Sequence, residues 1–222
     1  MAEIGETPFE DDGELDLNRE ETLGRIAELE GVIDAQSEEI GLLRLQLEML
    51  SATDVVTGLP NYTGLMQTIE KEVARRLRTN ETFGLVAVEI PALRNVEQLG
   101  LGALHDALRH CGAMISAGLR TSDTVGRIDE ATFVATLPMM MREGAAAVIG
   151  RIDTNLQAMP LTFDGETMQL IPAFSVIFCG EACGSSAEEL MGALATVRAE
   201  AAPGVPVIAS LTTEKGKVDR IS

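Results

Sequence analysis

The feature that most constrains the fold is a regular alternation of helix-like and strand-like segments after about residue 60. Apolar residues at helical spacing predict amphipathic helices, and short continuous apolar runs predict buried strands. The expected helices carry their apolar faces at Leu65, Ile69, Val73 and Leu77; at Leu104, Leu108, Cys111, Ile115 and Leu119; at Ala145, Val148, Ile149, Ile152 and Leu156; and at Leu190, Leu194 and Val197. The expected strands span Phe83–Ile90, Thr124–Ile128, Thr132–Leu137, Pro172–Phe178 and Val205–Ala209.

Two of these strands are close enough in sequence to form a central hairpin. Thr124–Ile128 and Thr132–Leu137 are separated only by residues 129–131, and Pro138 ends the second strand. A smaller side hairpin is predicted within Phe163–Leu170, around an Asp164–Gly165 turn. Helices that alternate with buried strands around one hairpin predict an α/β sandwich with a mixed central sheet.

The region before this domain has two parts. Residues 1–20 are acidic and contain few large apolar groups, so we expect a disordered tail. Residues 21–52 show a heptad pattern that predicts a parallel, two-stranded coiled coil, and hence a homodimer. Its core positions are Ile26, Leu29, Ile33, Gln36, Ile40, Leu43, Leu47 and Leu50. In a parallel pair Arg25 attracts Glu30 of the partner chain, and Glu39 attracts Arg44. The alternative is a single amphipathic helix that lies on its own domain.

The charge excludes several classes of partner. Thirty-five acidic residues outnumber 17 basic ones, and the net charge is -18. This charge repels nucleic-acid phosphates and anionic lipids, so we expect neither nucleic-acid binding nor membrane insertion. We expect no secretory leader, and Cys111, Cys179 and Cys183 lie in or beside apolar stretches. We therefore expect buried thiols in a cytoplasmic protein, with no cofactor.

A polar frame in the middle of the chain carries the functional information. Arg120 and Asp123 form an Arg-x-x-Asp motif five residues before the sequence Asp-Glu-Ala-Thr-Phe at 129–133. This frame resembles the bacterial GGDEF domains, the diguanylate cyclase family, in which an RxxD motif precedes Gly-Gly-Asp/Glu-Glu-Phe. The segment Asp54–Asn61 is similar to the family's D-x-L-T-G-L-P-N entry segment. The likeness extends to about Ser210 and implies that residues 53–222 form a GGDEF-like domain.

The resemblance also implies where catalytic metal ligands would stand. Cyclases join two GTP molecules with the help of divalent ions. In the family, carboxylates at the end of the first strand and at the fourth signature position bind these ions. The matching residues here are Glu89 and Thr132, and Pro91 replaces a further carboxylate. Thr132 has no anionic group, so we expect that the chain is not an enzyme and holds no metal. One alternative is a register shift in which Asp129 and Glu130 supply the carboxylates. Another is residual cyclase activity that depends on Glu89.

A second site implied by the family is the inhibitory site for cyclic di-GMP. The family binds this dinucleotide through the RxxD motif and an arginine on the helix after the signature. Arg120, Asp123 and Arg151 occupy these positions. We therefore expect a cyclic di-GMP-binding effector in bacterial signalling. The alternative is a ligand-independent scaffold that recruits protein partners through the coiled coil and the domain surface.

Overall fold

The structure is a computed structural model, and it describes residues 12–96, 98, 100–163, 165–180, 186–211 and 218–220. The chain divides into two compact units, Met1–Leu47 and Glu48–Ser222. None of the helices in the described ranges combines the length and the apolar character that a membrane span requires.

The described part of the first unit is formed by the helix α1, Asp12–Leu50, whose last three residues belong to the second unit. The helix begins earlier than residue 21, so it includes part of the segment that we expected to be a disordered tail, and residues 1–11 lie outside the described residues. Four core positions of the predicted coiled coil have described apolar side chains: Ile26, Leu29, Ile33 and Ile40. Each of them is about half exposed in this single chain.

The second unit is built on a mixed six-stranded sheet with the strand order β2-β3-β1-β6-β7-β8. These strands are β1 (Phe83–Glu89), β2 (Thr124–Arg127), β3 (Thr132–Pro138), β6 (Ala173–Cys179), β7 (Val207–Leu211) and β8 (Val218–Arg220). β1 pairs antiparallel with both β3 and β6, and only β6 and β7 run parallel. The predicted α/β sandwich with a mixed sheet is confirmed.

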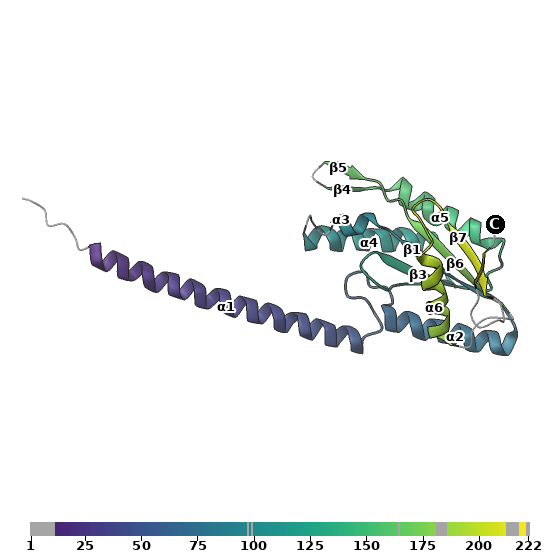
Figure 1. The fold of residues 1–222 in the computed structure, drawn as a ribbon, viewed down its shortest axis with the longest axis horizontal. Helices are drawn as coiled ribbons and strands as arrows, with labels where there is room; N and C mark the ends of the chain where they lie inside the picture. Colours follow the sequence, from purple (N-terminus) through teal and green to yellow (C-terminus); the bar gives the residue numbers. More distant parts are fainter. Residues whose placement is uncertain are drawn as a thin grey trace, which may run out of the picture. The chain divides into compact units, whose positions relative to one another are not determined.

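Helices cover both faces of this sheet (Figure 1). One face carries α3 (Ala92–Val96), α4 (Leu101–Ala117) and α5 (Gly144–Ala158), and the other carries α2 (Tyr62–Thr79) and α6 (Ala187–Arg198). Side chains alternate between the faces along β1: Val86 and Val88 pack toward α4 and α5, whereas Leu85 and Ala87 pack toward α2 and α6. Because both faces are buried, β1 is apolar over nearly its whole length.

Smaller elements complete the unit. The side hairpin is present as β4 (Leu161–Phe163) and β5 (Glu166–Met168), which pair antiparallel. β8 pairs with the outer edge of β7 and was not predicted from the sequence. Cys111 and Cys179 are buried free thiols as expected, whereas Cys183 lies outside the described residues. Burial raises the pKa of Cys111 to about 12, so this thiol is protonated and unreactive at neutral pH.

The entry segment Asp54–Asn61 is fixed to the sheet by a buried ion pair. The Asp54 carboxylate is 3% exposed, and its Oδ2 accepts a hydrogen bond from Nη1 of Arg127 on β2 at 2.8 Å. Its Oδ1 accepts from the Thr57 backbone N–H and hydroxyl, at 2.7 and 2.6 Å. The Asn61 side chain then caps α2 by accepting from the Gly64 N–H at 3.0 Å. The start of α2 is therefore positioned by β2.

We predict that Asp54→Ala lowers the free energy of unfolding by about 3 kcal/mol, because it leaves the Arg127 guanidinium partly buried without its carboxylate. Equilibrium unfolding in urea measures this cost. The matched control is Asp106→Ala, which breaks the pair with Arg109 on the surface of α4, where both side chains are more than half exposed. The control should cost less than about 1 kcal/mol. Equal costs for the two variants would contradict the role given to Asp54.

Candidate functional site

The hairpin between β2 and β3 places the signature residues beside the end of β1. The Ile128 N–H donates to the Thr132 carbonyl at 3.0 Å, which closes a turn of residues 129–131. Asp129 Oδ1 accepts from the Ala131 N–H at 3.0 Å, so the aspartate stabilises its own turn. Thr132 lies directly opposite Glu89 in the antiparallel ladder. Paired residues share one face of a sheet, and here it is the face that α6 covers.

Arg198, the last residue of α6, joins these side chains through one nitrogen atom. Its Nη2 lies 2.9 Å from Thr132 Oγ1, 3.3 Å from Asp129 Oδ2 and 3.6 Å from Glu89 Oε2. Arg94 Nη2 holds the other Glu89 oxygen, Oε1, at 2.9 Å. Two guanidinium groups therefore balance two carboxylates. We refer to Glu89, Asp129, Thr132 and Arg198 as the Arg198 cluster.

The pKa of Asp129 reports this environment. Partial burial alone would raise the pKa of its carboxyl group. The Ala131 N–H, the Thr132 hydroxyl and the Arg198 guanidinium all favour the charged form, and together they hold the pKa below its ordinary value. Asp129 is therefore a carboxylate at neutral pH and a full partner of Arg198.

The Arg198 cluster, as arranged here, does not fit a divalent metal ion. Both oxygens of Glu89 are engaged by arginines, and the residue opposite it, Thr132, is neutral. Across the described ranges, no group of three or more His, Cys, Asp or Glu side chains could hold a metal ion. The position between Glu89 and Asp129 is taken by a side-chain cation.

Arg198 was missed by the sequence reasoning, although a signal for it was present. Leu190 and Leu194 face the sheet from α6, and Arg198 follows Leu194 by one further step of four residues. Residues at this spacing lie on one face of a helix. An arginine that continues an apolar face at the end of a helix can extend its guanidinium over the edge of the sheet.

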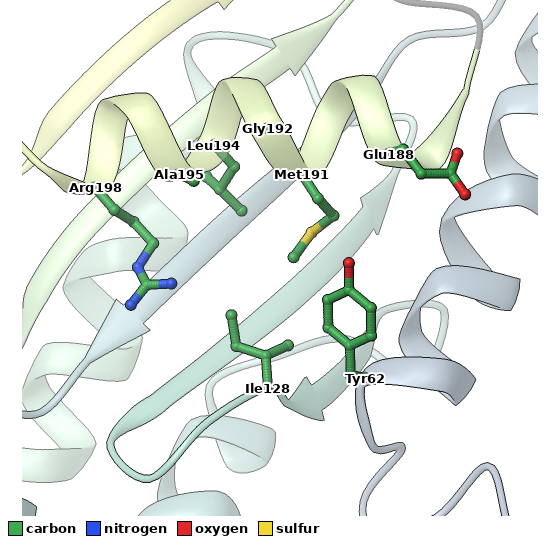
Figure 2. Close-up of a pocket in the computed structure, with 8 residues that line it drawn as sticks. All are labelled: Tyr62, Ile128, Glu188, Met191, Gly192, Leu194, Ala195 and Arg198. Atoms are coloured by element: carbon green, nitrogen blue, oxygen red, sulfur yellow. The ribbon is translucent and has the colours of Figure 1, made fainter. Parts of the chain in front are cut away.

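A pocket of about 390 Å³ lies between α6, the start of α2 and the hairpin. Figure 2 shows Met191 and Leu194 leaving α6 on the side that faces Tyr62 and Ile128, with Arg198 at one end of the pocket and Glu188 at the other. Its walls are mainly apolar, so the pocket itself supplies few polar partners for a ligand.

The RxxD motif lies on the opposite side of the sheet, in the turn between α4 and β2. Asp123 organises this turn: its Oδ2 accepts from the Arg120 N–H at 2.8 Å, and its Oδ1 accepts from the Ser122 hydroxyl at 3.1 Å. The Asp123 N–H in turn donates to the Arg120 carbonyl at 3.0 Å. The Arg120 side chain is exposed.

Arg151 approaches the same turn from α5. Its Nε donates to the Gly118 carbonyl at 2.8 Å, two residues before Arg120. A shallow pocket of about 430 Å³ lies beside it, between the end of α4 and α5. The structure thus brings the three predicted ligand-binding residues, Arg120, Asp123 and Arg151, to one end of α4. Their role in binding stays a prediction.

Gly118 allows this close approach of the two helices. A Cβ atom at this position would lie 2.8 Å from Ile152 Cγ1 and 3.1 Å from the Ile152 backbone nitrogen. Because Ile152 is fully buried and follows Arg151 directly, the spacing of α4 and α5 also sets the position of the Arg151 guanidinium.

Comparison with known proteins decides the family. The diguanylate cyclase GGDEF domain matches residues 51–200. This chain belongs to the GGDEF diguanylate cyclase family. Among curated relatives, the diguanylate cyclase DgcP of Pseudomonas aeruginosa is 26% identical over 183 residues, which cover 78% of this chain and 27% of that protein. The chain thus spans about a quarter of the length of this relative.

Solved GGDEF structures share the fold. Diguanylate cyclase SiaD of Pseudomonas aeruginosa, solved with its activator SiaC, has a TM-score of 0.66 and 20% identity, covering 88% of this chain and 76% of that chain. The coiled coil and GGDEF domain of DgcB from Caulobacter crescentus, solved with cyclic di-GMP, has a TM-score of 0.61 and 16% identity, covering 77% and 92%.

These comparisons correct one prediction from the sequence. We expected that the chain is not an enzyme because Thr132 replaces an acidic residue of the signature. That prediction is contradicted, since the family that matches is one of diguanylate cyclases and the curated relative is itself a diguanylate cyclase. The substitutions at 129–132 change the residues at the hairpin, and they do not remove the chain from a family of enzymes.

We predict that Gly118→Ala separates α4 from α5 and lowers the melting temperature, with a cost of about 1–3 kcal/mol from overpacking against Ile152. Differential scanning calorimetry measures the change. Gly150→Ala is the matched control on α5, because a Cβ there meets nothing within 4 Å. The control should stabilise the protein by about 0.5 kcal/mol, since alanine favours a helix interior over glycine. A neutral Gly118→Ala would show that the helices are not in tight contact.

Proposed function

We propose that this GGDEF protein acts in cyclic di-GMP signalling as an effector, and that it binds the dinucleotide at the end of α4 through Arg120, Asp123 and Arg151. The observation that carries the proposal is the hydrogen bond from Arg151 Nε to the Gly118 carbonyl. It fixes an arginine of α5 beside the turn that holds the other two residues. Binding residues from two separate elements thereby share one surface.

The chemistry of these groups suits guanine and phosphate. A guanidinium can donate two parallel hydrogen bonds to O6 and N7 of guanine, and a carboxylate can accept from N1–H and N2–H. Each Asp123 oxygen already accepts one hydrogen bond from its own turn, and a carboxylate oxygen can accept a second. Arginine also pairs well with the phosphates of a dinucleotide.

Two guanidinium groups at this turn can meet an anionic ligand, although the net charge of the chain is -18. Ion pairs neutralise Arg94 and Arg198 near the hairpin. By contrast, within the part of the chain that the structure describes, no carboxylate lies within 4.0 Å of the Arg120 or Arg151 guanidinium. Both charges are therefore available at the surface. The similar DgcB structure was solved with cyclic di-GMP, which supports this ligand.

We predict that the chain binds cyclic di-GMP in isothermal titration calorimetry. Arg120→Ala and Arg151→Ala should each weaken binding by about tenfold or more, because each removes charge-assisted hydrogen bonds. Arg109→Ala is the matched control, since Arg109 is an exposed arginine on α4 that lies outside this turn.

Two outcomes would contradict the proposal. One is the absence of heat with cyclic di-GMP for the folded wild-type chain, which favours a ligand-independent scaffold. The other is equal weakening by Arg109→Ala, which indicates only a general effect of charge. A parallel assay with GTP and magnesium measures the activity that belongs to the family.

We further propose that α1 pairs two chains as a parallel coiled coil. In α1, Ile26, Leu29, Ile33 and Ile40 fall at a and d heptad positions and are exposed in a single chain. A helix gains stability when such a stripe is buried against a second copy. The similar DgcB structure includes a coiled coil with its GGDEF domain, and a dimer would present two copies of the proposed binding surface.

We predict that the full chain sediments as a dimer in analytical ultracentrifugation, and that Ile33→Glu converts it to a monomer by placing a charge in the seam. Ala27→Glu introduces the same charge at an outward heptad position and should leave the dimer intact. If both variants remain dimeric, the dimer is formed elsewhere. If the wild type is a monomer, the apolar stripe has another role.

A further inference from the structure

We propose that Arg198 is a built-in cation that competes with divalent metal ions for Glu89 and Asp129. The proposal is independent of cyclic di-GMP binding. It rests on the convergence of three oxygen atoms from three residues on one nitrogen: Arg198 Nη2 lies within 3.6 Å of Glu89, Asp129 and Thr132 oxygens.

The oxygens come from rigid parts of the fold. Glu89 ends β1, and Thr132 begins β3 directly opposite it. Asp129 is held by its hydrogen bond to the Ala131 N–H. Two carboxylates this close to one point require a cation between them, because like charges repel strongly when partly removed from water. Removing the Arg198 cation should therefore leave a site with a high affinity for another cation.

The vacated point would suit a hard divalent ion. Carboxylate and hydroxyl oxygens are ligands that Mg²⁺, Ca²⁺ and Mn²⁺ accept, with water completing the coordination. The Asp129 side chain is 42% exposed, so water can reach this point from the solvent side. In the wild-type chain the same oxygens are engaged by the guanidinium, which is tethered to α6 and thus always present at high local concentration.

Arg94 provides an unusually close control. It also donates to Glu89, at 2.9 Å, but it contacts the other oxygen, Oε1. Arg94→Gln and Arg198→Gln therefore remove the same charge from the same glutamate. Only Arg198→Gln empties the point between Glu89, Asp129 and Thr132.

The experiment is a titration of the full chain with Mn²⁺, followed by electron paramagnetic resonance and by calorimetry. We expect Arg198→Gln to gain one Mn²⁺ site at least about tenfold tighter than any in the wild type, because a repulsive charge has been replaced by a neutral group. Arg94→Gln should gain no such site. Adding Glu89→Gln to Arg198→Gln should abolish the gain. Mn²⁺ should also raise the melting temperature of Arg198→Gln alone.

The proposal is overturned if the wild type binds Mn²⁺ as tightly as Arg198→Gln, or if Arg94→Gln gains the same affinity. It is also overturned if folded Arg198→Gln gains none. Should Arg198→Gln not fold without metal, its recovery on refolding with Mn²⁺ supports the proposal, and failure to recover overturns it. Arg198→Lys serves as a second variant that keeps a cation: it should exclude Mn²⁺ as the wild type does, and a new site in it would count against the proposal.

Discussion

The pairing of β1 with β3 is the constraint on which the rest of the domain depends. β1 lies between β3 and β6 and is antiparallel to both, so a shift of one residue would turn its whole side-chain pattern to the other face. Helices cover both faces, and no such shift could keep Val86 and Val88 in one half of the core and Leu85 and Ala87 in the other. A change of register would therefore cost a large part of the free energy of folding. It is this register that sets Glu89 opposite Thr132.

Charge compensation follows from that geometry. Once Glu89 is fixed at the end of a buried strand, its carboxylate must be satisfied by groups that the surrounding elements can supply. Arg94 reaches it from α3 and Arg198 from α6. The turn adds Asp129, whose charge Arg198 shares. Two helices on opposite faces of the sheet thus contribute one guanidinium each, and the cluster ties both layers to the hairpin.

The sequence allowed most of the architecture to be predicted, because the main helices have a clear apolar period and the main strands are short, largely apolar segments. The hairpin followed from its short turn, and the family followed from the RxxD frame and the entry segment. Arg198 was harder to find, because its role depends on where α6 ends relative to β1. That position is set by tertiary packing, which the local sequence pattern does not show. β8 has too few residues to show a period. The prediction of no enzyme was wrong because it weighed single signature positions above the likeness of the whole domain.

The Arg198 cluster and the proposed dinucleotide surface lie on opposite faces of the sheet. Glu89 and Thr132 share their face with Ala87 and Val134, in the part of the core that α2 and α6 cover. Arg151 lies on α5, which covers the other face of the sheet, where Ile152 packs with α4. Among the residues that the structure describes, the two surfaces share no hydrogen-bonding partner. Energetic effects of changes without shared partners add. A change at Arg198 should therefore leave dinucleotide binding unaltered. Any coupling between the two surfaces would have to pass through the β2–β3 hairpin. The first strand of this hairpin begins at the RxxD turn, and its loop carries Asp129.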